Sequence, residues 1–256
     1  MGRRKELLRT TARRFPRLAW IYRNLAWAVH EDKSQFGEQA LLTAHLPPSG
    51  LFLEVGAFQP IMFSNTWALE RRGWKGVAVD ANPEYAFAWR LFRRRTPFWA
   101  MAVTPSAQGE AVLFLTDPRY GAVSSLRRDH VERWSIPEGM SVHERVVRTL
   151  TVPELLKSYE RNHHRPPDFV QFDCEGMDAE LVEALLTDVD FEHLPTFLMI
   201  ESLEAGNEPT QLADYYQELG TAGVSRLLKK RTELATDQQH KQVEGLFIGP
   251  DEVPGL

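Results

Sequence analysis

Short apolar runs alternate with stretches of helical periodicity from residue 50 to about residue 230. Apolar runs of this length, bounded by turn residues, are typical of buried strands, and helices between them connect parallel neighbours. The pattern therefore predicts an α/β protein with a mostly parallel sheet and helices on both faces. Strands are expected at Leu51–Val55, Gly76–Asp80, Phe98–Val103, Ala111–Leu115, Arg145–Leu150, Phe169–Phe172, Thr196–Ile200 and, as a final antiparallel pair, at Arg226–Lys230 and Glu244–Ile248.

Helices are expected between these strands, and one of them has a well-defined start. Thr151 suits the N-cap position, and Pro153 and Glu154 follow in the first turn. No repeat or long linker divides the α/β region, so we expect one domain over residues 34–256, preceded by an arm over residues 1–33. The predicted helices cover Ser64–Arg72, Glu84–Arg95, Val152–Glu160, Asp178–Leu186 and Leu212–Leu219.

The arm is basic and has helical periodicity that Pro16 interrupts. Its first 30 residues carry eight Arg or Lys against one Glu, a net charge of +7, whereas the whole chain carries −5 and the remainder therefore −12. A basic amphipathic helix suits an anionic membrane surface; the alternative is a helix packed on the domain or on a second subunit. An acidic body argues against nucleic-acid binding.

The composition suits a cytoplasmic globular protein. Hydrophobic residues make up 43% of the chain, enough for a core, and no apolar run reaches the ~18–20 residues of a membrane span. The arm lacks the continuous apolar segment of a signal peptide. Cys174 is the only cysteine, which excludes an internal disulfide and a cysteine-based zinc site. Peripheral attachment to a membrane through the arm stays open.

The first strand carries two residues that point to a ligand. In open α/β sheets, ligands bind at the carboxyl ends of the strands. Glu54 is an ionisable residue in an apolar strand, which costs free energy unless the group is paired or binds something. The alternative role for Glu54 is a buried ion pair with Arg71 or Arg72. Gly56 permits a positive φ and a close approach of the backbone to a ligand.

Asp80 ends the second strand, 24 residues after Gly56. An acidic residue at this position can accept hydrogen bonds from both hydroxyls of a ribose, which indicates an adenosine-containing ligand. A dinucleotide site needs a glycine-rich turn for its pyrophosphate, but here Gly56 is followed by Ala57-Phe58-Gln59-Pro60. The turn therefore favours S-adenosylmethionine over a nicotinamide dinucleotide.

Five segments together match one known family over about residues 34–204. They are Ser34-Gln35-x-Gly37-Glu38, Phe52-Leu53-Glu54-Val55-Gly56-Ala57-x-x-Pro60, Ser64-Asn65-Thr66, Gly73-Trp74-x-Gly76-Val77-x-Val79-Asp80-Ala81-Asn82-Pro83 and Pro167-Asp168-Phe169-Val170-x-Phe172-Asp173-x-Glu175-Gly176-x-Asp178. The chain resembles the FkbM-type S-adenosylmethionine-dependent methyltransferases. The resemblance implies a Rossmann-like class I methyltransferase fold with seven strands, the last antiparallel, and methyl transfer to a hydroxyl of a sugar, glycan or secondary metabolite. Pro60 departs from the commoner family pattern.

The resemblance also implies a cofactor site. Glu54 and Gly56 are expected at the methionine part, Asp80 at the ribose, and Ala102 and Val103 around the adenine. For Ser64 and Asn65 a helix-capping role stays open, and for Asn82 a turn role. The full predicted set is Gln35, Glu54, Gly56, Ala57, Phe58, Ser64, Asn65, Asp80, Ala81, Asn82, Ala102 and Val103.

The predicted reactive centre follows the strand that ends at Phe172. A hydroxyl group is a weak nucleophile until a base removes its proton, a step typically worth about 10²–10⁴ in rate. We expect Asp173 to be that base, with Glu175 and Glu201 in support. Three alternatives stay open: Mg²⁺ held by Asp173 and Glu201, a histidine base from the polar insertion at residues 117–146, and purely structural capping or ion pairing. The candidate histidines are His130 and His143.

Other polar residues are expected to be passive. Cys174 lacks a histidine partner in the sequence pattern, so an inert thiol is expected. The basic cluster of Arg90 and Arg93–Arg95 resembles a solvated helix end. Two further functions remain as alternatives to the enzyme: a catalytically silent binding scaffold with the same fold, and a nicotinamide-dependent oxidoreductase.

Overall fold

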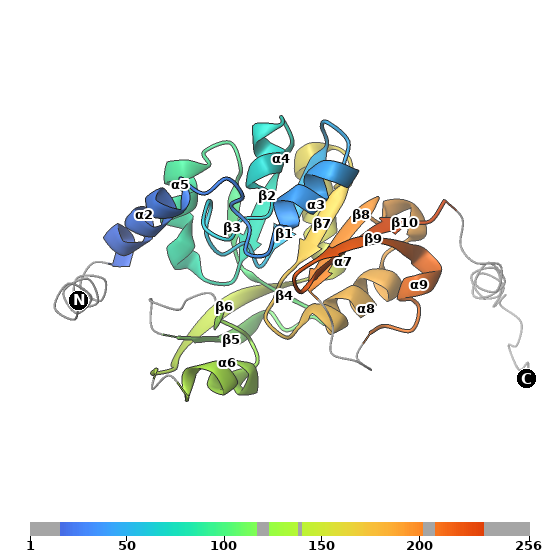
Figure 1. Ribbon diagram of the computed structural model, residues 1–256. Helices are drawn as coiled ribbons and strands as arrows, with labels where there is room; N and C mark the ends of the chain where they lie inside the picture. The colour runs from blue at the N-terminus through green and yellow to red at the C-terminus, as the bar shows by residue number, and fades with distance from the viewer. Residues whose placement is uncertain (1–15, 117–122, 138–139, 202–207, 233–256) are drawn as a thin grey trace, which may run out of the picture.

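The computed structural model describes residues 16–116, 123–137, 140–201 and 208–232. Its centre is a seven-stranded sheet in the order β3-β2-β1-β7-β8-β10-β9 (Figure 1). Neighbouring strands are parallel except at β10, which is antiparallel to both β8 and β9. The sheet strands are β1 (Leu51–Val55), β2 (Lys75–Asp80), β3 (Phe98–Ala100), β7 (Phe169–Phe172), β8 (Phe197–Glu201), β9 (Tyr216–Ala222) and β10 (Ser225–Lys230). The predicted α/β class with an antiparallel final strand is confirmed.

Helices cover both faces of this sheet because its central strands are apolar on both sides. Every residue of β1 and β7 is buried, as expected for strands between two helical layers. Leu53 and Val55 pack with α7, α8 and α9, whereas Phe52 faces the layer that includes α3 and α4. The helices are α2 (Pro16–Trp27), α3 (Glu38–His45), α4 (Trp67–Arg71), η1 (Pro83–Tyr85), α5 (Ala86–Phe92), α6 (Arg128–Ser135), α7 (Val152–His163), α8 (Asp178–Asp188), η3 (Phe191–His193) and α9 (Leu212–Tyr215).

The single strand predicted at Phe98–Val103 is in fact two strands in different sheets. β3 pairs with β2, whereas β4 (Ala102–Thr104) pairs in parallel with β6 (His143–Thr151). The chain changes sheets at Met101, whose N–H donates to the carbonyl of Asp80 at 3.0 Å. β5 (Glu110–Leu115) completes the small second sheet, antiparallel to β6. The continuous apolar pattern hid this change of sheet because both strands are largely apolar.

The predicted helix at Leu212–Leu219 is wrong beyond its first turn. α9 ends at Tyr215, and β9 follows at once and pairs along its whole length with β10. This edge pairing overrides the local helical periodicity, since strand preference depends strongly on tertiary context. The strand predicted at Glu244–Ile248 lies outside the described residues.

The helix of the arm, α2, begins at Pro16 and packs on the domain. Proline is favoured in the first turn of a helix because its missing N–H has no intrahelical partner there. Trp20 is buried and meets the rings of Phe58 and Tyr85 edge-on. The part of the arm before Pro16 lies outside the described residues. None of the helices that the structure describes is long and apolar enough to cross a lipid bilayer.

Candidate functional site

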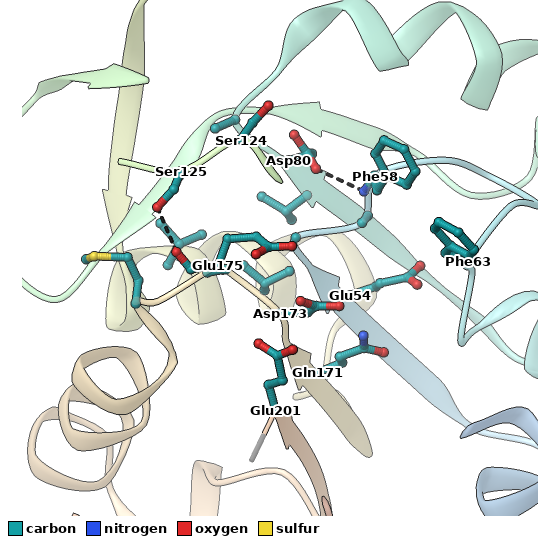
Figure 2. A pocket seen from close by; sticks show the side chains of 18 of the residues that line it. Glu54, Phe58, Phe63, Asp80, Ser124, Ser125, Gln171, Asp173, Glu175 and Glu201 are labelled. Atoms are coloured by element: carbon teal, nitrogen blue, oxygen red, sulfur yellow. Dashed lines mark hydrogen bonds between the residues drawn. The ribbon is translucent and has the colours of Figure 1, made fainter. Parts of the chain in front are cut away.

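A cleft opens at the carboxyl ends of β1, β2, β7 and β8 and extends to β4 and the insertion after β5 (Figure 2). All three predicted catalytic residues, Asp173, Glu175 and Glu201, line it. Among the predicted cofactor residues, only Ser64 and Asn82 do not. The predicted cofactor residues that line the cleft are Gln35, Glu54, Gly56, Ala57, Phe58, Asn65, Asp80, Ala81, Ala102 and Val103.

Gly56 brings the loops after β1 and β7 into contact. Its φ is +82°, and a Cβ on this residue would lie 1.7 Å from the carbonyl oxygen of Asp173. On either side, the N–H of Gly56 donates to Val79 and the N–H of Asp173 donates to Val55. Glycine is therefore required here by both backbone conformation and space.

The carboxylate of Asp80 is fixed at the end of β2. It accepts the N–H of Phe58 at 2.9 Å on one oxygen and the N–H of Asn82 at 2.7 Å on the other. Burial raises the pKa of Asp80 to about 6, although these two hydrogen bonds oppose the rise. Each carboxylate oxygen has a second lone pair, so Asp80 can still accept hydroxyl donors from a ligand.

Glu54 lines the cleft and is also part of a buried ion pair. It accepts the hydroxyl of Thr66 at 2.5 Å, and Nη1 of Arg93 lies 3.7 Å away. Burial raises the pKa of Glu54, against the opposing effects of Arg93 and Thr66. The alternative role for Glu54 was an ion pair with Arg71 or Arg72; the structure shows the ion pair with Arg93 instead.

The prediction that Arg93 is solvated is wrong. Its side chain is fully buried, and its Nε donates to Glu70 at 2.5 Å. Its Nη1 donates to the hydroxyls of Ser64 and Thr66, both at 3.0 Å. Arg93 therefore connects α5 to the segment before α4, and Ser64 serves this network rather than the cleft.

The two predicted asparagines differ in their roles. Asn82 caps η1 by accepting the N–H of Glu84 at 3.1 Å, so its turn role is the one the structure supports. Asn65 is buried on the cleft wall, and its Oδ1 has no hydrogen-bond partner. An unpaired buried oxygen costs free energy until a ligand or water supplies a donor.

The reactive centre gathers the carboxylates of Asp173, Glu175 and Glu201. Figure 2 shows Asp173 near Glu175 and Glu201. Burial raises the pKa of Asp173 well above its ordinary value, and the charges of Glu175 and Glu201 raise it further. Burial and Glu175 likewise raise the pKa of Glu201 to about 7. Burial also raises the pKa of the Cys174 thiol, as expected for an inert cysteine.

Only one of the two candidate histidines reaches this centre. Nε2 of His130, on α6, lies 2.9 Å from Oε2 of Glu175. His143 is exposed and pairs with Ser141 at 3.3 Å. In the same insertion, the hydroxyl of Ser125 donates a hydrogen bond to the carbonyl oxygen of Glu175, at 2.7 Å. The insertion thus forms one wall of the cleft and leaves His130 as the one candidate histidine at the centre.

Gln171 is a cleft residue that the sequence analysis missed. It lies on β7 directly beside Glu54 on β1, is 4% exposed, and its Oε1 has no partner. The signal was present, because Gln171 is a polar residue in an apolar strand, the same pattern that identified Glu54. Glu38, another missed acidic residue, also lines the cleft.

The charge of the lining is one-sided. Among the described residues that line the cleft, six are acidic and none is Lys, Arg or His. The acidic residues are Glu38, Glu54, Asp80, Asp173, Glu175 and Glu201.

The described residues contain no group of three or more His, Cys, Asp or Glu side chains placed to hold a metal ion. The alternative of a magnesium ion held by Asp173 and Glu201 therefore has no support.

Three solved structures show distant similarity to this chain. A TehB-like SAM-dependent methyltransferase from Corynebacterium glutamicum has 12% identity and a TM-score of 0.41, over 84% of this chain and 97% of that one. An O-methyltransferase from Bacillus cereus, in complex with SAH, has 13% identity and a TM-score of 0.39, over 82% of this chain and 89% of that one. The 1,6-didemethyltoxoflavin-N1-methyltransferase of Burkholderia thailandensis has 13% identity and a TM-score of 0.38, over 88% of this chain and 85% of that one. Similarity at this level assigns neither site nor substrate.

The sequence comparisons are more informative. No curated protein is significantly similar to this chain. The family model of the methyltransferase FkbM domain matches residues 54–222, which include the end of β1, the whole of β2, β7 and β8, and every acidic residue of the cleft except Glu38. With most of its length matched by that model, the chain belongs to the FkbM methyltransferase family.

Proposed function

We propose that the protein is an S-adenosylmethionine-dependent methyltransferase that methylates a hydroxyl group of a small molecule or glycan. The observation that carries the proposal is the one-sided charge of the cleft, where six described residues are acidic and none is basic. A field of this sign attracts a cationic ligand and repels a pyrophosphate. It therefore favours a sulfonium compound over a nicotinamide dinucleotide.

The remaining cleft residues fit the other parts of S-adenosylmethionine. Asp80 offers free lone pairs to a ribose diol, and Ala102 and Val103 offer apolar surface to an adenine. The buried oxygens of Asn65 and Gln171 lack donors, and an amino group would supply them. Each of these features is matched by one part of the same molecule.

When bound, S-adenosylmethionine supplies an electrophilic methyl group, which a nucleophilic oxygen takes to leave S-adenosylhomocysteine. The role of Asp173 is to take the proton of the acceptor hydroxyl on its carboxylate. Its raised pKa makes it a stronger base than an exposed aspartate, which favours this transfer. Glu175 and Glu201 reinforce that basicity through their charges.

Calorimetric titration tests the cofactor. S-adenosylmethionine and S-adenosylhomocysteine are expected to bind the full chain, and NAD(H) is not. Asp80→Asn is expected to weaken S-adenosylhomocysteine binding by about 10–100-fold, because a hydrogen bond to a charged group is worth about 1.5–3 kcal/mol.

Asp188→Asn, an exposed change at the end of α8, is the control and should bind normally. Binding of NAD(H) instead would replace the proposal with the oxidoreductase alternative.

Product analysis tests the reaction. The purified chain with S-adenosylmethionine is expected to release S-adenosylhomocysteine and form a methyl ether when given a panel of monosaccharides, glycosides and hydroxylated metabolite extracts. Methylation at nitrogen or carbon would contradict the hydroxyl assignment. Cofactor binding without turnover across the panel would favour the silent scaffold.

A further inference from the structure

A row of apolar side chains lies on the outward side of α2 and just beyond its end. Leu18, Tyr22, Leu25 and Val29 are 58%, 63%, 54% and 84% exposed. They are spaced by four, three and four residues, the spacing that places side chains on one side of a helix. Exposed apolar side chains that gather on one side of a helix indicate an interaction surface, whereas scattered single ones do not.

The opposite side of α2 is fixed to the domain, so this row cannot turn inward. The Asn24 side chain is completely buried, donates to Gln59 at 2.7 Å and accepts the N–H of Ile61 at 3.0 Å. One turn away, Trp20 packs against Phe58, a residue of the cofactor cleft. The rotation of α2 is therefore set by buried contacts. In Figure 1, α2 lies at the periphery of the molecule, beside α5.

The first 30 residues, which include the row, are basic in sequence, whereas the rest of the chain is acidic. Arg17 is exposed on α2 itself. The first 30 residues carry a net charge of +7, and the remainder carries −12. The arms of two copies of the chain, both basic, would repel each other. An anionic lipid surface would attract the arm and repel the acidic body, which also sets the orientation of docking.

We propose that α2 docks the protein on an anionic lipid surface. The side chains of Leu18, Tyr22 and Leu25 enter the boundary between headgroups and acyl chains, and the exposed Arg17 contacts the lipid phosphates. Through Trp20, the docked helix contacts the wall of the cofactor cleft. In this arrangement, the membrane lies on the side of the molecule where α2 packs against the cleft wall.

Vesicle co-sedimentation of the full chain tests this proposal. Binding is expected to vesicles of phosphatidylcholine mixed with phosphatidylglycerol, and much less to phosphatidylcholine alone, with a decrease as salt rises. Leu18→Ser/Tyr22→Ser/Leu25→Ser is expected to lower the partition coefficient at least about tenfold, since it removes most of the apolar area that would be buried. Circular dichroism should confirm that this variant is folded.

Val112→Ser/Val146→Ser is the matched control, because these two exposed valines face each other across β5 and β6, outside the arm. This variant should bind vesicles normally. Equal binding by the α2 variant and the wild type, or equal binding to neutral and anionic vesicles, would overturn the proposal. A dimer in sedimentation velocity that the α2 variant abolishes, without vesicle binding, would assign the face to a second copy instead.

Discussion

Replacement of Arg93 by Met is expected to lower the free energy of unfolding by about 3–5 kcal/mol. The substitution removes the only described cation beside Glu54 and leaves that carboxylate buried without its partner. It also removes the hydrogen bonds that Arg93 donates to Glu70 and to the hydroxyls of Ser64 and Thr66. Removal of one member of a buried ion pair is costly because the remaining charge stays out of water without compensation.

Urea denaturation followed by circular dichroism measures this effect. Arg94→Met is the control: Arg94 is the next residue along the chain but is exposed, so a change within about 0.5 kcal/mol is expected. Adding Glu54→Gln to Arg93→Met should recover part of the loss, since the amide is easier to bury than a carboxylate. If Arg93→Met were no more destabilising than Arg94→Met, the buried network would contribute nothing to stability.

Asp173→Asn is expected to lower turnover by about 10²–10⁴, the usual contribution of a general base. The amide keeps the size of the side chain, and the backbone hydrogen bond from Asp173 to Val55 is unaffected. Affinity for S-adenosylhomocysteine should therefore stay within a few-fold of the wild type. Turnover is measured as S-adenosylhomocysteine release with an acceptor found in the product analysis, and affinity by calorimetry.

Glu183→Gln, an exposed change on α8, is the control for this experiment and should leave turnover unchanged. Full activity of Asp173→Asn would remove the base assignment. His130→Gln then becomes the informative variant, since His130 contacts Glu175 at the same centre. A large loss in His130→Gln together with an active Asp173→Asn would transfer the role of base to the histidine.

Local sequence signals determined the elements that depend on local chemistry. β1 and β7 were predicted at their observed bounds, because short, mostly apolar runs between turn residues are typical of buried strands. The start of α7 was predicted from its capping residues, and the structure shows the reciprocal capping box between Thr151 and Glu154. The positions of Gly56 and Asp80 at the strand ends also followed, because strand ends in a parallel sheet share one edge.

The tertiary structure decided everything that depends on a partner distant in the chain. The pairing of β9 with β10 converted an expected helix into a strand, and the change of sheet at Met101 divided an apolar run that has no internal break. In the sequence, nothing distinguishes Arg93 from its exposed neighbours. In the folded chain it lies beside Glu54, and an arginine can be buried only where an acidic partner compensates its charge. Sequence patterns record whether a residue prefers to be buried; which residues then lie against it is a property of the folded chain.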